Sequence, residues 1–141
     1  MENIDVLDSL SLFMKPLSVD DWMSIENPDF KDKSWNMMMH KVASFHSKFD
    51  FDNPENRGHD MGYRIALTVE ELGEFAAAVT KEKPIEEAAE ELADILILIL
   101  GHSLALKIDL YEQFCMKIDK IMERPAIQTR LGIRVTEYKN E

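Results

Sequence analysis

Residues 67–106 read LTVEELGEFAAAVTKEKPIEEAAEELADILILILGHSLAL, which predicts two helices joined by a short turn at the Lys-Glu-Lys-Pro sequence. Each helix carries two acids three residues apart, Glu71 with Glu74 and Glu91 with Asp94. Side chains at this spacing are neighbours on a helix surface. In an antiparallel hairpin centred on the turn, Glu71 lies level with Asp94, and Glu74 with Glu91. Carboxylates gathered at one place in this way predict a bound cation.

The surroundings of the acids favour a metal site over an acidic hairpin whose charges are all solvated. From Leu92 to Leu106 the second helix is apolar on nearly every side, which predicts a buried helix. Asp94 inside it needs a positive partner, because a lone buried carboxylate is heavily penalised. Oxygen ligands alone suit Mg²⁺ or Mn²⁺ rather than zinc. The core stripe of the first helix is predicted to be Ile65, Val69, Leu72, Ala76 and Val79.

The two acid pairs around a helical hairpin resemble the all-α nucleoside triphosphate pyrophosphohydrolase superfamily. This group includes the MazG-like proteins, the dimeric dUTPases and the phosphoribosyl-ATP pyrophosphohydrolases. The similarity runs from about His40 to Pro125. It implies that Mg²⁺, with Mn²⁺ as a substitute, is held by Glu71, Glu74, Glu91 and Asp94.

The same resemblance implies hydrolysis of a nucleoside triphosphate between its α and β phosphates, which gives the monophosphate and pyrophosphate. One of the acids, Glu71 or Glu74, is expected to activate the attacking water. The implied role is the removal of unwanted or excess nucleotides. Members of the superfamily associate, so a homodimer or homotetramer is expected.

Length and composition indicate the number of domains and argue against several other classes of function. A chain of 141 residues is expected to be one domain with a single core. Its formal net charge of −11 argues against a nucleic-acid footprint, which needs a basic stripe. The one cysteine excludes an internal disulfide and is compatible with the cytoplasm. The N-terminus has no signal-peptide pattern, and Leu92–Leu106 is too short to span a membrane.

Two further segments precede the hairpin. Residues 1–33 are expected to form an N-terminal helical extension, and residues 34–125 the MazG-like core. In the extension, one helix is predicted over Ile4–Met14. A second follows Ser18, which is an N-cap candidate, and ends before Asn27.

The segment SWNMMMHKVASFHSKF, residues 34–49, has apolar residues at helical spacing and predicts the first core helix. The resemblance makes His46 and Phe49 on this helix candidate contacts for the nucleotide base. Residues 50–60, rich in turn formers, predict a loop. His59 and Arg57 on this loop are either exposed residues or contacts for phosphate.

A fourth helix is predicted over Leu110–Glu123. Lys117, Lys120 and Arg124 form a basic stripe along it, which is either solvated or, by the resemblance, a clamp for the phosphates. The tail, residues 126–141, holds a short β-like run and is expected to be an arm or disordered.

The predicted fold is therefore all-α, a four-helix bundle of the MazG type built on the acidic hairpin. One alternative function is phosphoribosyl-ATP pyrophosphohydrolase, which shares the chemistry. Another is a non-catalytic acidic module that binds a basic partner without a metal. A ferritin-type di-iron bundle is disfavoured, because no histidine follows a glutamate by three residues.

Overall fold

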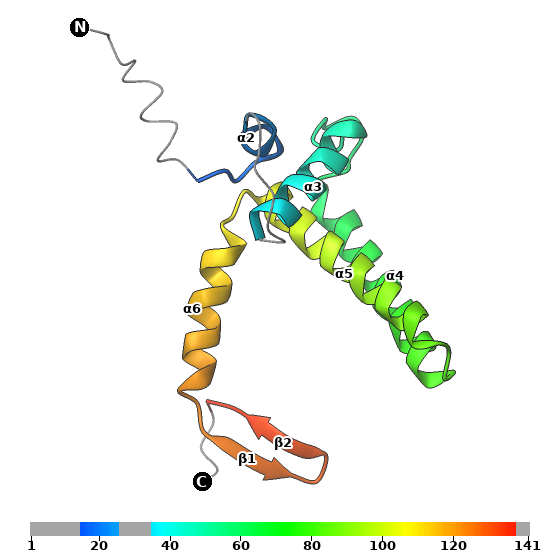
Figure 1. Ribbon diagram of the computed structural model, residues 1–141, viewed down its shortest axis with the longest axis vertical. Coiled ribbons are helices and arrows are strands. Elements are labelled where there is room, and N and C mark those ends of the chain that lie inside the picture. Colours follow the sequence, from blue (N-terminus) through cyan, green and yellow to red (C-terminus); the bar gives the residue numbers. More distant parts are fainter. Residues whose placement is uncertain (1–14, 26–34, 138–141) are drawn as a thin grey trace, which may run out of the picture. The chain divides into compact units, whose positions relative to one another are not determined.

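The computed structural model describes residues 15–25 and 35–137 of the chain. It divides into two compact units, Met1–Ile108 and Asp109–Glu141. No helix in the described residues is long and apolar enough to cross a lipid bilayer. The elements, drawn in Figure 1, are helices α2 (Val19–Met23), α3 (Trp35–Lys48), α4 (Met61–Thr80), α5 (Ile85–Leu106) and α6 (Leu110–Met122), and strands β1 (Ala126–Thr129) and β2 (Gly132–Val135).

Helices α4 and α5 lie side by side as the antiparallel hairpin that the sequence predicts (Figure 1). Asp60 caps α4: its carboxylate accepts a hydrogen bond from the backbone N–H of Tyr63 at 2.9 Å, a donor with no partner inside the helix. In the connecting turn, Glu82 adopts a left-handed conformation with φ of 52°. Pro84 occupies the N-cap of α5, where the helix needs no N–H donor. Lys107 ends α5 with φ of 53°.

Helix α3 packs on α5, and α2 packs on α3, so these three helices enclose the core of the first unit. The predicted cap at Ser18 is confirmed, because its side chain and that of Asp21 form a reciprocal capping box. Helix α2 is shorter than the sequence indicates, and the helix predicted over Ile4–Met14 lies outside the described residues. The buried apolar side chains include Val19, Trp22, Met39, Val42, Ala43, Leu100 and Leu104.

The predicted core stripe of α4 is wrong. Ile65, Val69, Leu72 and Val79 are each more than half exposed. Helix α5 instead covers the neighbouring stripe of α4, whose buried or half-buried residues are Arg64, Leu67, Thr68, Glu71, Phe75 and Ala78. Both stripes have helical spacing, so periodicity alone did not distinguish the face that the partner helix covers.

The prediction that α5 is buried on every side is also wrong. Its inward side chains, among them Leu100 and Leu104, are almost fully buried. Leu92 and Leu96 are 51% and 43% exposed, and Asp94 is exposed beside them. An apolar helix is buried only on the faces where other elements pack.

The second unit contains α6 and a β-hairpin. Strands β1 and β2 pair in an antiparallel register that places Thr129 opposite Gly132 and Ala126 opposite Val135. Gly132 follows the tight connection with φ of 132°, a value that other residues rarely adopt. The β-like run expected in the tail is thus a strand, and its partner β1 was not predicted.

The described residues are predominantly helical, and the predicted all-α class is confirmed. The helices expected for the core are all present as α3, α4, α5 and α6. The boundaries expected for the extension, the core and the tail stay predictions.

Candidate metal and nucleotide site

Three of the predicted acids come together between α4 and α5. Glu71 from α4 and Glu91 and Asp94 from α5 each offer one carboxylate oxygen, and these oxygens lie within 4.8 Å of one another. We call this group the acid cluster. Glu71 and Asp94 are equally far from the turn, so the antiparallel hairpin brings them to the same level, and Glu91 lies one turn before Asp94 on the same face of α5. Glu74, one turn nearer the hairpin tip, is exposed and does not belong to this group of three.

The acid cluster has no positive partner within the described part of the chain, where none of its three carboxylates forms an ion pair. The pKa of Glu71 is raised, first by partial burial and then by the charges of Asp94, Glu74 and Glu91. Like charges held close together are unfavourable unless a cation joins them. The arrangement is therefore electrostatically prepared for a positive ligand.

The donor set fits a hard divalent cation. All three side chains are carboxylates, and oxygen ligands select Mg²⁺, Mn²⁺ or Ca²⁺ over softer metals. Two of the three acids are half-buried and one is exposed, so a cation there would have protein ligands on one side and water or substrate on the other. Such an open coordination sphere is what a metal needs to bind phosphate oxygens.

An apolar cavity of about 550 Å³ adjoins the acid cluster, and Glu71 and Asp94 are part of its wall. Helix α3 contributes Met38, Lys41, Val42 and Phe45 to the wall. These residues recur at positions i, i+3, i+4 and i+7, so they share one face of α3. The cavity has the size and the largely apolar lining of a small-molecule site, with polar groups at one side. The apolar stripe of this helix was interpreted mostly as core, and the sequence did not assign Met38, Lys41 or Phe45 to a ligand site.

The two base-contact candidates on α3 are placed differently from this cavity wall. His46 is 1% exposed, and its Nδ1 lies 2.8 Å from Nε2 of His59, within hydrogen-bond distance. Burial, with smaller contributions from Arg64 and the other histidines, lowers the pKa of His46 to about 3. Phe49 is 52% exposed and packs edge-on against Phe45. Neither residue is part of the cavity wall, and their contact with a base stays a prediction.

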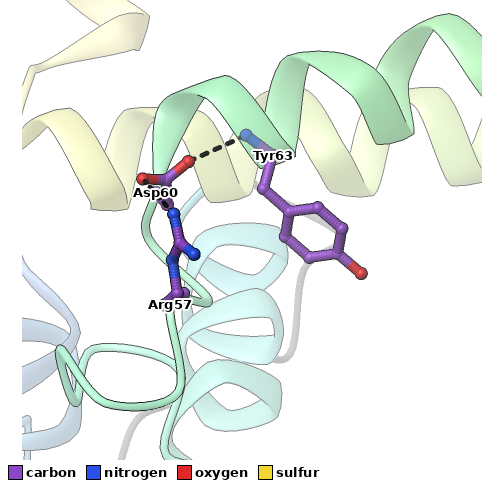
Figure 2. Close-up of polar contacts among 3 residues, drawn as sticks. All are labelled: Arg57, Asp60 and Tyr63. Atoms are coloured by element: carbon purple, nitrogen blue, oxygen red, sulfur yellow. Dashed lines mark hydrogen bonds and ion pairs between the residues drawn. The ribbon is translucent and has the colours of Figure 1, made fainter.

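The predicted loop over residues 50–60 is confirmed as a series of turns. Its two candidate phosphate ligands both have partners in the structure. Arg57 lies 3.8 Å from the carboxylate of Asp60, which also caps α4 through the backbone N–H of Tyr63 (Figure 2). Both members of this ion pair are largely exposed, so it contributes little to stability. His59 faces His46 rather than solvent.

The predicted phosphate clamp lies in the second unit. Lys117 and Lys120 are exposed on α6. Arg124 follows the helix and forms an ion pair with Glu137, which ties the end of α6 to the segment after β2. The role of the three basic residues in phosphate binding stays a prediction.

Comparison with known proteins agrees with the geometry. The family model of the MazG nucleotide pyrophosphohydrolase domain matches residues 63–127, from the first turn of α4 into β1. Residues 63–127 are thus similar to the MazG domain. The predicted resemblance is thereby confirmed, and it supports a nucleotide pyrophosphohydrolase, which is a hydrolase. All four predicted acids lie within the matched segment, and MazG domains generally work with divalent metals. No curated protein and no solved structure matches the chain.

Proposed function

We propose that the protein is a Mg²⁺-dependent nucleoside triphosphate pyrophosphohydrolase that cleaves between the α and β phosphates. The observation that carries the proposal is the acid cluster beside an apolar cavity, inside a segment that matches the MazG domain. Carboxylates without cationic partners suit a metal–polyphosphate ligand. An adjoining apolar cavity suits a nucleoside.

Glu71, Glu91 and Asp94 would hold the cation, with Glu74 available one turn away. Bound Mg²⁺ supplies neutralisation of the phosphate charge and orientation of the triphosphate. Either Glu71 or Glu74 accepts the proton of the water that attacks the α-phosphorus, and the bond from that phosphorus to the bridging oxygen breaks. Pyrophosphate leaves, and Lys117, Lys120 and Arg124 are the candidates for steadying it.

The base would enter the cavity between α3 and the hairpin. Met38 and Phe45 offer apolar contact, and Lys41 offers one positively charged donor to a base carbonyl or a phosphate. Lys41 forms no ion pair with any described residue. We propose that these residues, together with His46 and Phe49, whose rings contact that of Phe45, form the base-binding part of the site.

The exposed apolar stripe of α4 supports the expected self-association. Ile65, Val69, Leu72 and Val79 lie along one side of the helix, and contiguous apolar surface of this kind usually marks an interface. A second copy of the chain is the proposed occupant, as a homodimer or homotetramer. Analytical ultracentrifugation should show a dimer or larger species, and Val69→Asp should shift it to the monomer.

Identification of the products tests the reaction. The purified protein is incubated with canonical and damaged nucleoside triphosphates and with phosphoribosyl-ATP, with Mg²⁺ or with EDTA, and the products are separated by anion exchange. We expect monophosphate and pyrophosphate with Mg²⁺ only. Glu91→Gln should lose about 100-fold or more in turnover, since it removes a proposed metal ligand. Glu90→Gln, an exposed neighbour outside the acid cluster, is the matched control.

Each other outcome rejects a definite part of the proposal. Orthophosphate as the product would mean that a different bond is cut. Equal activity of Glu91→Gln and Glu90→Gln would remove the acid cluster from the reaction. If phosphoribosyl-ATP alone were hydrolysed, the enzyme would belong to the alternative class.

A further inference from the structure

A buried arginine network lies in the same α4–α5 interface as the acid cluster. Arg64 is 3% exposed, yet no described carboxylate forms an ion pair with it. Its guanidinium donates three hydrogen bonds instead: Nε to Nδ1 of His102 at 3.0 Å, Nη1 to the carbonyl of Gly58 at 3.0 Å, and Nη2 to the carbonyl of Leu98 at 3.2 Å. One side chain therefore joins α4 to the loop before it and to α5.

These hydrogen bonds fix the protonation of His102. A guanidinium can only donate, so Nδ1 of His102 must accept and carries no proton. Nε2 of the same ring lies 2.8 Å from Oγ1 of Thr68, whose hydroxyl donates to the carbonyl of Arg64 at 2.9 Å. The Nε2 proton is then donated to the Thr68 oxygen. Arg64, Thr68 and His102 form a closed ring of hydrogen bonds, which we call the arginine network.

A glycine of α5 makes room for this network. A Cβ atom on Gly101 would lie 2.2 Å from Nη2 of Arg64 and 2.8 Å from Nε2 of His46. Real Cβ contacts are never this close. The guanidinium and the His46 ring therefore lie directly on the backbone of α5, and a side chain at position 101 would force them to shift.

The arginine network and the acid cluster use the same two helix faces. Thr68 precedes Glu71 by three residues and His102 follows Asp94 by eight, which corresponds to about 4.5 Å and 12 Å along the helix axes. The hydrogen bonds between Thr68 and His102 and between Arg64 and Leu98 thus join α4 to α5 within a few turns of the carboxylates. A slide or rotation of one helix against the other would separate Glu71 from Asp94.

We propose that Arg64, Thr68 and His102 are positioning residues, which hold α4 and α5 in the alignment that brings the carboxylates of the acid cluster together for the metal. The inference rests on the proposed function, since it concerns the same metal site. It does not require any of the three residues to touch metal or substrate. The neutral Nε2–H form of His102 is part of the proposal.

Manganese affinity is the first test, measured by electron paramagnetic resonance or calorimetry on the full chain at pH 7.5. Thr68→Val removes the hydroxyl that links α4 to His102, and we expect about tenfold weaker Mn²⁺ binding, the lower end of the effect seen for outer-shell partners. Thr80→Val is the matched control. Thr80 makes the same bond to the carbonyl four residues back at 2.8 Å, but it is exposed at the hairpin end. We expect its affinity to stay within twofold of the original.

Two substitutions at position 102 separate positioning from simple filling of space. His102→Gln can accept from Arg64 and donate to Thr68, so it should keep Mn²⁺ affinity within about threefold. His102→Leu fills similar volume without hydrogen bonds and should lose about tenfold. Circular dichroism confirms that each variant is folded. Equal affinities for Gln and Leu, or for Thr68→Val and Thr80→Val, would overturn the inference.

A nitrogen NMR measurement is independent of the metal. The imidazole nitrogens of ¹⁵N-labelled protein should show Nε2 of His102 protonated and Nδ1 bare at pH 7.5. The opposite tautomer would overturn the inference. If the tautomer is as expected but the unsubstituted chain binds no Mn²⁺, the proposed metal site does not exist. The positioning role would then be rejected because there is no metal site to position.

Discussion

Two levels of the α4–α5 hairpin handle charge in opposite ways. About halfway along α4, three carboxylates gather without a described cation, and all of them keep some exposure to solvent. Near the loop before α4, a guanidinium is buried without a described carboxylate and is satisfied by neutral acceptors. The acid cluster is thus electrostatically incomplete, whereas the arginine network is complete. The acid cluster is the part that can bind a ligand, and in the proposed arrangement the arginine network holds the two helices in place for it.

The difference also explains the pattern of titration in the interface. Burial, followed by the charge of Arg64, lowers the pKa values of His46, His59 and His102. Burial alone lowers the pKa of Arg64. In the acid cluster, burial and neighbouring carboxylates raise the pKa of Glu71. Each group is pushed away from its charged form, but only the acids can be relieved by an added cation.

The largest expected effect is on packing at the arginine network. Gly101→Ala places a methyl group on the Arg64 guanidinium, so we expect a loss of about 2–3 kcal/mol in the free energy of unfolding. Gly73→Ala, between the acids of α4, meets nothing within 4 Å and should gain up to about 1 kcal/mol from helix propensity. Urea denaturation measures both. Similar effects of the two substitutions would contradict the close contact of Arg64 with α5.

The next effect is on the dependence of stability on pH. The folded chain holds His46 neutral, with a pKa of about 3, whereas the unfolded chain binds a proton near its ordinary value of 6.5. The unfolded state then binds more protons, so stability falls as the pH drops below about 6.5. His46 alone should cost about 1 kcal/mol between pH 7 and pH 5.5, with His59 and His102 acting in the same direction.

Urea denaturation at several pH values from 7.5 to 5 measures this slope. The groups that face His46 are His59, His102 and the Arg64 guanidinium, and Asp52 acts weakly on His59 in the opposite direction. His102→Gln should make the slope shallower. A free energy of unfolding that is constant from pH 7 to pH 5.5 would show that the histidines are not held neutral.

The smallest expected effect is at the acid cluster in the absence of metal. Glu71→Gln removes one of several repelling carboxylates, whose mutual repulsion raises the pKa of Glu71. Pairs of like charges on a helix cost a few tenths of a kcal/mol, so the metal-free melting temperature should rise by about 1–3 °C. The stabilisation by added Mg²⁺ should disappear. Glu90→Gln should keep it, and a loss of the Mg²⁺ effect in both would place the cation outside the acid cluster.

Several features followed from the sequence because their cause is local. The helical hairpin has apolar periodicity on both sides of a turn that contains proline. The mirror-image spacing brought Glu71 to Asp94 as predicted, whereas Glu74, expected beside Glu91, is not in the group of three. Ser18 acts as an N-cap through its own hydroxyl and its neighbours. The family resemblance depended on these same acids, and the MazG match agrees with it.

The arginine network and the cavity wall could not be predicted from the sequence, because they depend on tertiary contacts. Arg64 and Thr68 carry no motif, and a buried arginine without a described acidic partner runs against the usual preference of charged residues for the surface. The cavity wall from α3 depends on which face of that helix α5 meets. His46 is on the same helix as Met38, Lys41 and Phe45, which line the cavity, but its ring faces His59 and is not part of the cavity wall.

By itself, the sequence determined the helices, the turn and the level at which the carboxylates meet, because helix geometry fixes the spacing of side chains along an axis. The tertiary structure decided the rotation of each helix about that axis. Two stripes of α4 have equivalent spacing, and only the packing of α5 selects the stripe that contains Arg64, Thr68 and Glu71. Burial, hydrogen-bond partners and pKa shifts all follow from that rotation, since they depend on which atoms surround a side chain.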